Sequence, residues 1–510
     1  MKSHAPHRLL PLVLALLGWA AQAPLFAAES PARPNILWIV VDDMSAPFSC
    51  YGEKVIQTPH VDRLAREGTR FSRAYVTAPV CSPCRSALIT GHYQTTLGAH
   101  QHRSGRGQLK IRLPEGITPV PVLLQKAGYY TCIGSGLDAA EGAAPGGRGR
   151  GAGGGLGKTD YNFEWEKAMY DGNDWGGRKP GQPFFMQAQL AGGKLRGGTD
   201  ASARQLAARA QRELGGSTDP EKVVLPPYYP RDPVLLRDWA AYLDTARFTD
   251  DHVGKILARL EKEGILDQTL ILFITDNGIS HARGKQFLYD EGTWIPFIAR
   301  GPGIPQGRVR PDLAEHLDLA AISLAAAGLP LPAGMPSRNL FAPGYQPREA
   351  AFAARDRCDE TVERLRSVRT DRFLYIRNFY PLRPLLQPNV YKDHKTIVQT
   401  LRSLHAAGRL NELQESLLFS PTRPAEELYD YTRDPHQLTN LAADPAHRTT
   451  LEALRGRLDR WLKESRDPGL EPASMYDSDM KVYLEDRGNA NLEETRRNIG
   501  LMKQWAREGK

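Results

Sequence analysis

Two pairs of polar residues each end an apolar run of the kind that forms a strand buried on both faces of a sheet. The runs span residues 35–41 and 269–275, and the pairs are Asp42–Asp43 and Asp276–Asn277. Ligands bind at the carboxyl ends of strands in an open parallel sheet, so these four side chains are expected to lie together. Three carboxylates this close would raise one another's pKa, and Ca²⁺ or Mg²⁺ would relieve the repulsion. Each pair alone also fits a turn, but the two together predict a metal site.

A second group of reactive residues lies in the segment CSPCRSALITG at residues 81–91. As a CxxC pair, Cys81 and Cys84 would suit a structural zinc ion, a redox couple or a disulfide. Zinc needs a second such pair or histidines at metal spacing, and a redox couple needs a thioredoxin-sized βαβ unit; the sequence offers neither. The chain has five cysteines. This low, odd number excludes a disulfide scaffold and leaves open whether Cys84 is paired.

The same segment resembles the maturation signature of the formylglycine-dependent sulfatases, which is Cys-x-Pro-x-Arg followed by Leu-x-Thr-Gly. The resemblance extends from about residue 34 to residue 468. Within the family, residues 366–369 (RSVR) and the closing segment are most similar to the heparan N-sulfatase (sulfamidase) branch. Further matches lie at residues 58–65, 276–278, 284–289, 427–430, 433–435 and 440–442.

This resemblance implies an α/β fold, an alkaline-phosphatase-like three-layer sandwich with a large, mostly parallel sheet and a smaller C-terminal α+β domain. It implies a sulfuric ester or sulfamate hydrolase that releases inorganic sulfate from a sulfated carbohydrate. A maturation enzyme would convert Cys81 to formylglycine, whose gem-diol attacks sulfur and forms a covalent sulfo-enzyme intermediate. An ordinary cysteine or serine would stall there, whereas the second hydroxyl of the diol expels sulfate as the aldehyde re-forms.

The resemblance also assigns roles to individual residues. Arg85 would orient residue 81 and neutralise the sulfate, Lys285 would bind the sulfate oxygens, and Lys158 matches a family lysine. Stabilisation of charge in this way is usually the largest catalytic term. One divalent metal, Ca²⁺ by resemblance with Mg²⁺ allowed by the ligand types, would be bound by Asp42, Asp43, Asp276, Asn277 and the modified Cys81.

The sequence departs from the family pattern at two histidines. Asp160 replaces the first, after Lys158, and Lys194 stands where the second is expected, near the leaving group. The acid that protonates the leaving group is therefore open among Lys194, Lys285 and His281, although His281 also fits a solvated loop. Asp160 and His100 are predicted to contact the substrate.

The charge balance and the N-terminal segment indicate which partners and which cellular location to expect. The chain has 510 residues with 66 Lys and Arg against 58 Asp and Glu, and this mild excess fits a polyanionic ligand without requiring one. No nucleic-acid partner is expected, because the glycine-rich segment lacks interleaved aromatic residues and the protein is expected to be exported. Residues 1–28 read as a signal peptide, cleaved after Ala27 or Ala28, with a membrane anchor as the alternative. No later stretch approaches the ~18 uninterrupted apolar residues of a membrane span, so a periplasmic or secreted protein without a stable membrane anchor is expected.

The remaining patterns predict the domain organisation. A catalytic domain is expected at 29–345, with a glycine-rich loop inserted at 134–157, followed by an α+β domain at 346–470 and a poorly anchored charged tail at 471–510. Predicted helices lie at 239–260, 319–327 and 451–463, and predicted short strands at 366–369 and 373–377.

Two other functional classes stay open. A phosphonate or phosphate monoester hydrolase of the same superfold is the first, because one fold hosts both chemistries. The second is a non-catalytic relative that binds sulfated glycans. It stays open because both family histidines are absent from their expected positions.

Overall fold

The central strand β1 (Asn35–Val41) is buried along its whole length and pairs in parallel with two strands. Val41 lies opposite Leu190 of β4 (Phe184–Leu190) and opposite Thr275 of β5 (Thr269–Thr275). Both strands predicted from the apolar runs are therefore confirmed with the predicted bounds. The sheet has seven strands in the order β3-β4-β1-β5-β6-β2-β7, and only the pairs β5–β6 and β6–β2 are antiparallel. The other strands are β2 (Thr69–Tyr75), β3 (Tyr130–Gly134), β6 (Trp294–Arg300) and β7 (Arg308–Glu315).

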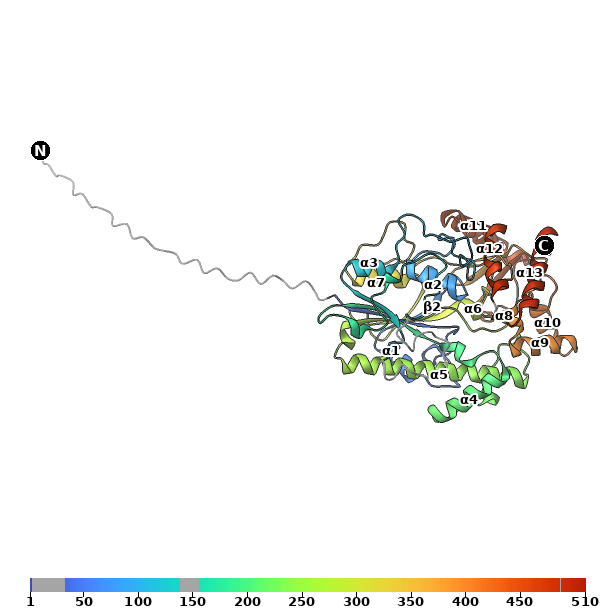
Figure 1. Ribbon diagram of the computed structural model, residues 1–510, viewed down its shortest axis with the longest axis horizontal. Helices are drawn as coiled ribbons and strands as arrows, with labels where there is room; N and C mark the ends of the chain where they lie inside the picture. Colours follow the sequence, from blue (N-terminus) through green and yellow to red (C-terminus); the bar gives the residue numbers. More distant parts are fainter. Residues whose placement is uncertain (2–32, 138–155, 487) are drawn as a thin grey trace. The chain divides into compact units, whose positions relative to one another are not determined.

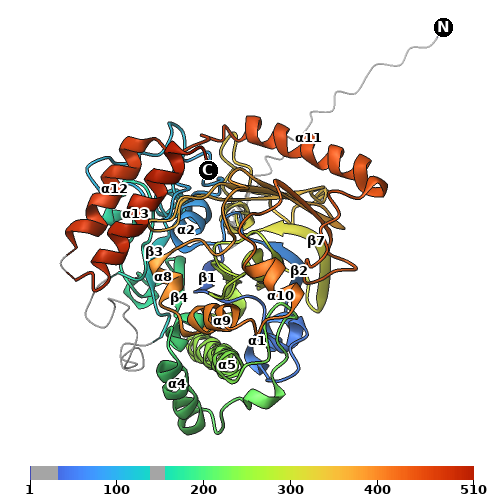
Figure 2. The ribbon, with the colours of Figure 1, turned by 90° about the vertical axis from the view of Figure 1, so that its right-hand side faces the viewer.

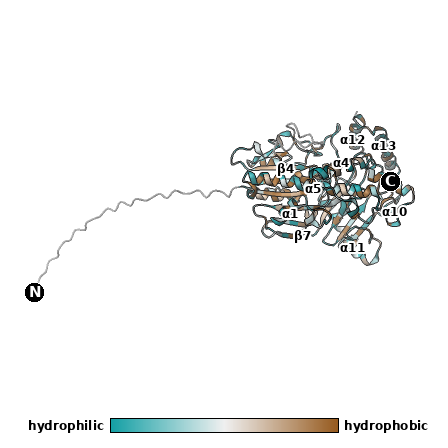
Figure 3. Cartoon of the chain, turned by 90° about the horizontal axis from the view of Figure 1, so that it is seen from below, coloured by the Kyte–Doolittle hydropathy of each residue, from teal (hydrophilic) through white to brown (hydrophobic). Residues whose placement is uncertain are grey.

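Helices cover both faces of this sheet, as Figure 1 shows. Side chains alternate along β1, so that Trp38 packs in the core under one layer of helices and Ile39 in the core under the other. Figure 3 shows hydrophobic residues along the central strands, as this double burial requires. The arrangement is the predicted three-layer α/β sandwich. One layer contains α2 (Cys81–Thr90), α3 (Val120–Lys126) and α7 (Asp318–Ala326), and the other contains α1 (Pro59–Arg66) and α5 (Pro233–Lys262).

A second, antiparallel sheet of four strands forms the C-terminal part, in the order β11-β10-β9-β8. Helix α11 (Arg448–Glu464) packs on it, with Leu458 and Trp461 against Val368 and Tyr375. The smaller C-terminal α+β region is therefore confirmed. Its strands are β8 (Ala351–Arg355), β9 (Leu365–Arg369), β10 (Phe373–Asn378) and β11 (Glu426–Asp430).

Residues beyond 470 differ from the expected poorly anchored tail. They form α12 (Ala473–Glu485) and α13 (Leu492–Arg507), which lie side by side in Figure 2. Tyr476, Met480 and Met502 form a small buried cluster between them. The buried Arg357 also bonds Asp479 at 2.6 Å. The segment is highly charged, but its two helices are held by a few apolar contacts and by a buried ion pair between Asp479 and Arg357.

The computed structural model describes residues 1, 33–137, 156–486 and 488–510. The predicted signal peptide with its cleavage site, and most of the glycine-rich insertion at 134–157, lie outside the described residues. Residues 34–510 form one unit. Among the described residues, no helix is long and apolar enough to span a membrane. The remaining helices are α4 (Asp200–Glu213), α6 (Asp290–Thr293), α8 (Val390–Asp393), α9 (Thr396–Ala406) and α10 (Glu412–Leu418).

Candidate active site

The side chains that follow β1 and β5 meet because the two strands end side by side. The Asp43 backbone N–H donates to Asp276 Oδ1 at 3.0 Å, and Asn277 Nδ2 donates to Asp43 Oδ1 at 3.1 Å. Asp43 takes a left-handed backbone conformation with φ 50°, which is uncommon for a residue other than glycine. All four predicted metal ligands on these strands, Asp42 included, are buried.

Cys81 is the first residue of α2, and its side chain points at these ligands. Its Sγ lies 3.5 Å from Asp43 Oδ1, 3.6 Å from Asn277 Oδ1 and 3.0 Å from Lys285 Nζ. Asp43, Cys81 and Asp276 each offer a ligand atom, and these atoms lie within 4.8 Å of one another. Carboxylate and amide oxygens facing one point fit a hard divalent cation. Burial raises the pKa of the unmodified Cys81 thiol, so the cysteine itself is a poor nucleophile here.

Four cations surround the three carboxylates. The Arg85 Nε donates to Asp276 Oδ2 at 3.1 Å, and another nitrogen of its guanidinium pairs with Asp42. Lys158 lies 3.1 Å from Asp42 and 3.5 Å from Asp276. Lys285 lies 2.6 Å from Asp43. Lys194 pairs with Asp42, and its Nζ lies 3.8 Å from Cys81 Sγ. We refer to Asp42, Asp43, Asp276, Arg85, Lys158, Lys194 and Lys285 as the charged cluster.

The charged cluster has one more cation than anions, and this balance sets the protonation states. Burial opposes ionisation of Asp42, but Lys158, Lys194 and Arg85 together hold its pKa well below the usual range. Asp276 has a raised pKa, because burial and the neighbouring Asp42 outweigh the cations that it shares. Burial disfavours the ammonium groups of both Lys194 and Lys285, yet the adjacent aspartates keep their pKa values high. A site of this charge attracts an anion.

His281, the third candidate for the leaving-group acid, lies outside the charged cluster. Its Nε2 lies 2.6 Å from Asp238 Oδ2 and 2.9 Å from a guanidinium nitrogen of Arg196. Its ring also packs on Trp239, with 4.9 Å between centroids, so the alternative of a solvated loop histidine is wrong. Burial, reinforced by Arg196, lowers its pKa to about 4, and the imidazole is therefore neutral near pH 7.

The two predicted substrate contacts have different surroundings. Asp160 pairs with Arg106, and although burial opposes ionisation, Lys158 and Arg106 keep its pKa below the usual range. His100 is buried, and neither ring nitrogen has a hydrogen-bond partner among the described residues. Burial and the nearby Arg366 lower the pKa of His100 to about 3. Asp160 thus borders the charged cluster, whereas His100 is enclosed.

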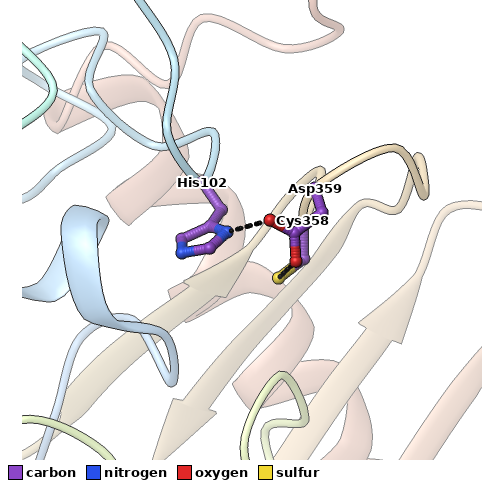
Figure 4. A group of neighbouring side chains, drawn as sticks. All are labelled: His102, Cys358 and Asp359. Atoms are coloured by element: carbon purple, nitrogen blue, oxygen red, sulfur yellow. Dashed lines mark hydrogen bonds and ion pairs between the residues drawn. The ribbon is translucent and has the colours of Figure 1, made fainter. Parts of the chain in front are cut away.

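Figure 4 shows a second group of potential metal ligands, made of His102, Cys358 and Asp359. His102 Nδ1 lies 3.1 Å from Asp359 Oδ1, and the Sγ of Cys358 lies 3.9 Å from Asp359 Oδ2. Tyr483 of α12 also donates to Asp359, at 2.9 Å. These contacts connect the loop around His102 to the C-terminal helices. All five cysteines, including Cys84, are free thiols.

The structure adds two residues that sequence patterns did not indicate, Tyr391 and Lys395. The Tyr391 hydroxyl donates to Asp43 Oδ2 at 3.4 Å and lies 2.9 Å from Ser280 Oγ. The ammonium group of Lys395 lies 4.7 Å from the centre of the Tyr391 ring. Both come from the segment around α8, far along the chain from any motif. Their types and spacing carry no signature, so only the fold brings them to the site.

Comparison with known proteins agrees with this geometry. The family model described as Sulfatase matches residues 34–329. An ulvan-active sulfatase of Formosa agariphila is 32% identical over 487 residues, covering 87% of this chain and 77% of the relative. The N-sulphoglucosamine sulphohydrolase of Homo sapiens is 28% identical over 481 residues, covering 86% and 91%. A solved structure of BT4656 in complex with its substrate D-glucosamine-2-N,6-O-disulfate shares the fold, with TM-score 0.55, 19% identity and coverage of 86% and 99%.

The fold and the family match therefore identify a hydrolase whose charged cluster lies at the carboxyl edge of its sheet. The chain belongs to the sulfatase family, and the N-sulphoglucosamine sulphohydrolase is among its relatives. It is an enzyme of the sulfatase class.

Proposed function

We propose that this enzyme hydrolyses a sulfuric ester or sulfamate of a sulfated carbohydrate and releases inorganic sulfate, with N-sulfated glucosamine as the first candidate substrate. The observation that carries the proposal is the position of Cys81. It begins helix α2 within a Cys-x-Pro-x-Arg sequence, 3.0 Å from Lys285 and within the predicted metal ligands. The named substrates of the relatives support an amino sugar.

A single divalent ion, Ca²⁺ by family resemblance, would be bound by Asp42, Asp43, Asp276, Asn277 and residue 81. When bound, this ion supplies charge stabilisation at the sulfate oxygens and acidifies the attacking hydroxyl. The residues of the chain do the rest of the binding. Lys285 and Lys194 flank Cys81 at 3.0 and 3.8 Å and would contact the sulfate oxygens, while Arg85 fixes the two carboxylates behind them.

Residue 81 would act after conversion of Cys81 to formylglycine by a maturation enzyme. The modified residue supplies a hydrated aldehyde whose hydroxyl attacks sulfur. The chain supports this role by position: the side chain starts a helix, whose N-terminus favours developing negative charge, and two ammonium groups lie beside it. The unmodified thiol, with its raised pKa, lacks that reactivity.

Lys194 is our assignment for the acid that protonates the departing oxygen or nitrogen. It lies next to Cys81, and its side chain is 37% exposed, so it can reach a substrate that enters from solvent. Lys285 is 4% exposed and engaged with Asp43. The Nε2 of His281 is bonded to Asp238 and the ring is neutral, so His281 lacks the acidic imidazolium proton that a general acid would donate at neutral pH.

Export belongs to the same proposal. The leader at 1–28 would direct the protein to the periplasm or the outside of the cell, where polysaccharides are accessible. N-terminal sequencing of the mature protein tests it, with a start after Ala27 or Ala28 as the expected result. A mature protein that keeps Met1 would contradict it.

The reaction class is tested with four substrates and one preparation. Protein produced together with a formylglycine-generating enzyme is supplied with Ca²⁺ and assayed on N-sulfoglucosamine, glucosamine 6-sulfate, an aryl sulfate and the matched aryl phosphonate. Sulfate release from a sugar, with a higher kcat/KM for the aryl sulfate than for the phosphonate, is the expected result. Preference for the phosphonate would identify the phosphonate hydrolase, and binding of sulfated sugars without any release would identify the non-catalytic relative.

A further inference from the structure

Lys395 is a buried cation that forms no ion pair with any carboxylate of the described residues. The residue is 8% exposed. Within the described part of the chain its ammonium group forms neither an ion pair nor a hydrogen bond, and it lies 4.7 Å from the centre of the Tyr391 ring. Burying a charge without a partner costs free energy, and an anionic ligand that pairs with the ammonium group would offset this cost.

The anions around Lys395 are already engaged. Asp238 pairs with Arg196 at 3.1 Å, and Asp43 pairs with Lys285 at 2.6 Å. Lys395 therefore shares its surroundings with the cations Arg196 and Lys285 and the anions Asp43 and Asp238, which makes three cations and two anions in all. Burial, followed by the repulsion from Arg196, lowers the pKa of Lys395 to about 8. The surplus positive charge therefore lies at Lys395, beside the charged cluster but not part of it.

Tyr391 fixes where this surplus charge is presented. Its hydroxyl is bonded to Ser280 and to Asp43, so the ring is attached to the same side chain that is predicted to bind the metal. Lys285 and Lys395 lie 5.4 and 4.7 Å from the ring centre, within the range of cation–π attraction. The residue is nevertheless 37% exposed. One partly exposed aromatic side chain thus contacts both Lys395 and Lys285, the lysine assigned to the sulfate.

We infer that Lys395, positioned by Tyr391, binds a second anionic group of the substrate, next to the sulfate that is hydrolysed. The inference rests on the proposed function and narrows its substrate class to sugars that carry two nearby negative charges. The second charge is a sulfate on the same sugar or a carboxylate on an adjoining uronate. Both present oxygens to an ammonium group in the same way.

Binding is measured by calorimetry on Cys81→Ala protein with Ca²⁺, so that no turnover is needed. The ligands are N-sulfoglucosamine, N,6-O-disulfoglucosamine and a disaccharide of a uronate and N-sulfoglucosamine. Adding Lys395→Met is expected to reduce the affinity for one of the two dianionic ligands by about tenfold or more, because a hydrogen bond to a charged group is lost. The ligand that loses affinity identifies the source of the second charge. Lys395→Arg, which keeps the charge, is expected to retain most of the affinity.

Two controls separate binding from structure. Lys222→Met removes an exposed lysine paired with Asp219 and is expected to change no affinity. Lys395→Met is expected to melt at the same or a higher temperature than the parent, because a buried unpaired charge is removed. A clear loss of stability would assign Lys395 a structural role and overturn the inference.

The inference and the proposed function fail in different ways. Equal affinity of both proteins for all three ligands, a uniform loss that includes N-sulfoglucosamine, or no measurable binding of either dianionic ligand would overturn the role of Lys395. None of these results bears on sulfate release, which is measured separately on the unmutated enzyme. Absence of sulfate release from every sulfated sugar would contradict the proposed function, whatever the binding data give.

Discussion

Replacement of Arg85 by methionine tests whether the buried carboxylates face a metal. Its side chain is buried and bridges Asp42 and Asp276. Removing one partner of a buried ion pair costs about 3–5 kcal/mol, because the remaining charges lose their compensation. The entropy of unfolding of a unit of this length is about 1 kcal/mol per kelvin at the melting temperature. Dividing the lost free energy by this entropy gives an expected fall in melting temperature of about 3–5 °C in the absence of metal.

Calcium should change this result. Arg85 and a divalent cation compete for the same carboxylates, so the variant gains more from Ca²⁺ than the unmutated protein does. We therefore expect the deficit of Arg85→Met to be several degrees in EDTA and to shrink or vanish in excess Ca²⁺. Scanning calorimetry under both conditions gives the four melting temperatures that the comparison needs.

Arg348 provides the matched control. It is buried and bridges two buried carboxylates, Glu315 and Asp318, away from the charged cluster. Arg348→Met should lose a similar amount of stability, with the same deficit in EDTA and in Ca²⁺. If Ca²⁺ restores both variants equally, or restores neither, the carboxylates at the ends of β1 and β5 are not a metal site.

Three further predictions concern protonation and catalysis. The ring of His316 is buried: its Nδ1 accepts from the Thr77 N–H at 3.3 Å, and its Nε2 lies 3.0 Å from the Cys84 carbonyl. Burial lowers the pKa of His316 to about 4, so the ring is neutral near pH 7. The unfolded-state pKa is about 6.5, so the buried neutral ring contributes up to about 3 kcal/mol to the free energy of unfolding; this contribution is complete above pH 6.5 and is lost as the pH falls toward 4. In urea titrations between pH 4 and 6.5, the free energy of unfolding of His316→Gln should therefore depend less steeply on pH than that of the unmutated protein. An unchanged slope would contradict this assignment. Lys194→Met should lower kcat for a sugar sulfate by about 100-fold or more, and much less for a nitrophenyl sulfate whose leaving group needs no proton; equal losses would exclude Lys194 as the acid. Cys81→Ala should abolish sulfate release while sulfated ligands still bind, as calorimetry can determine.

The sequence predicted the positions that depend on strong local patterns. The runs at 35–41 and 269–275 are continuous and β-branched, so the strands and the pairs that follow them could be located to the residue. The stripe at 239–260 likewise predicted the middle of α5. Because parallel strands end at one sheet edge, the meeting of Asp42, Asp43, Asp276 and Asn277 followed from the pattern alone.

Other features depend on tertiary contacts that no local pattern encodes. His281 was open to a role in catalysis or in a solvated loop, and it is instead enclosed by Trp239, Asp238 and Arg196, which come from α5 and a distant turn. The segment at 471–510 is highly charged, and its few apolar residues do not reveal that Arg357 bonds Asp479. Lys395 carries no motif, and its surplus charge becomes visible only after each neighbouring anion has been matched to a cation.

Catalysis by this sulfatase is proposed to depend on residue 81, converted from cysteine to formylglycine, as the nucleophile. Preparations made with increasing amounts of a formylglycine-generating enzyme can be compared by mass spectrometry of the peptide containing residue 81 and by sulfate released from the preferred sugar. We expect the initial rate to be proportional to the fraction of converted residue 81 and to extrapolate to zero for the unconverted cysteine. A rate that is independent of conversion would contradict it.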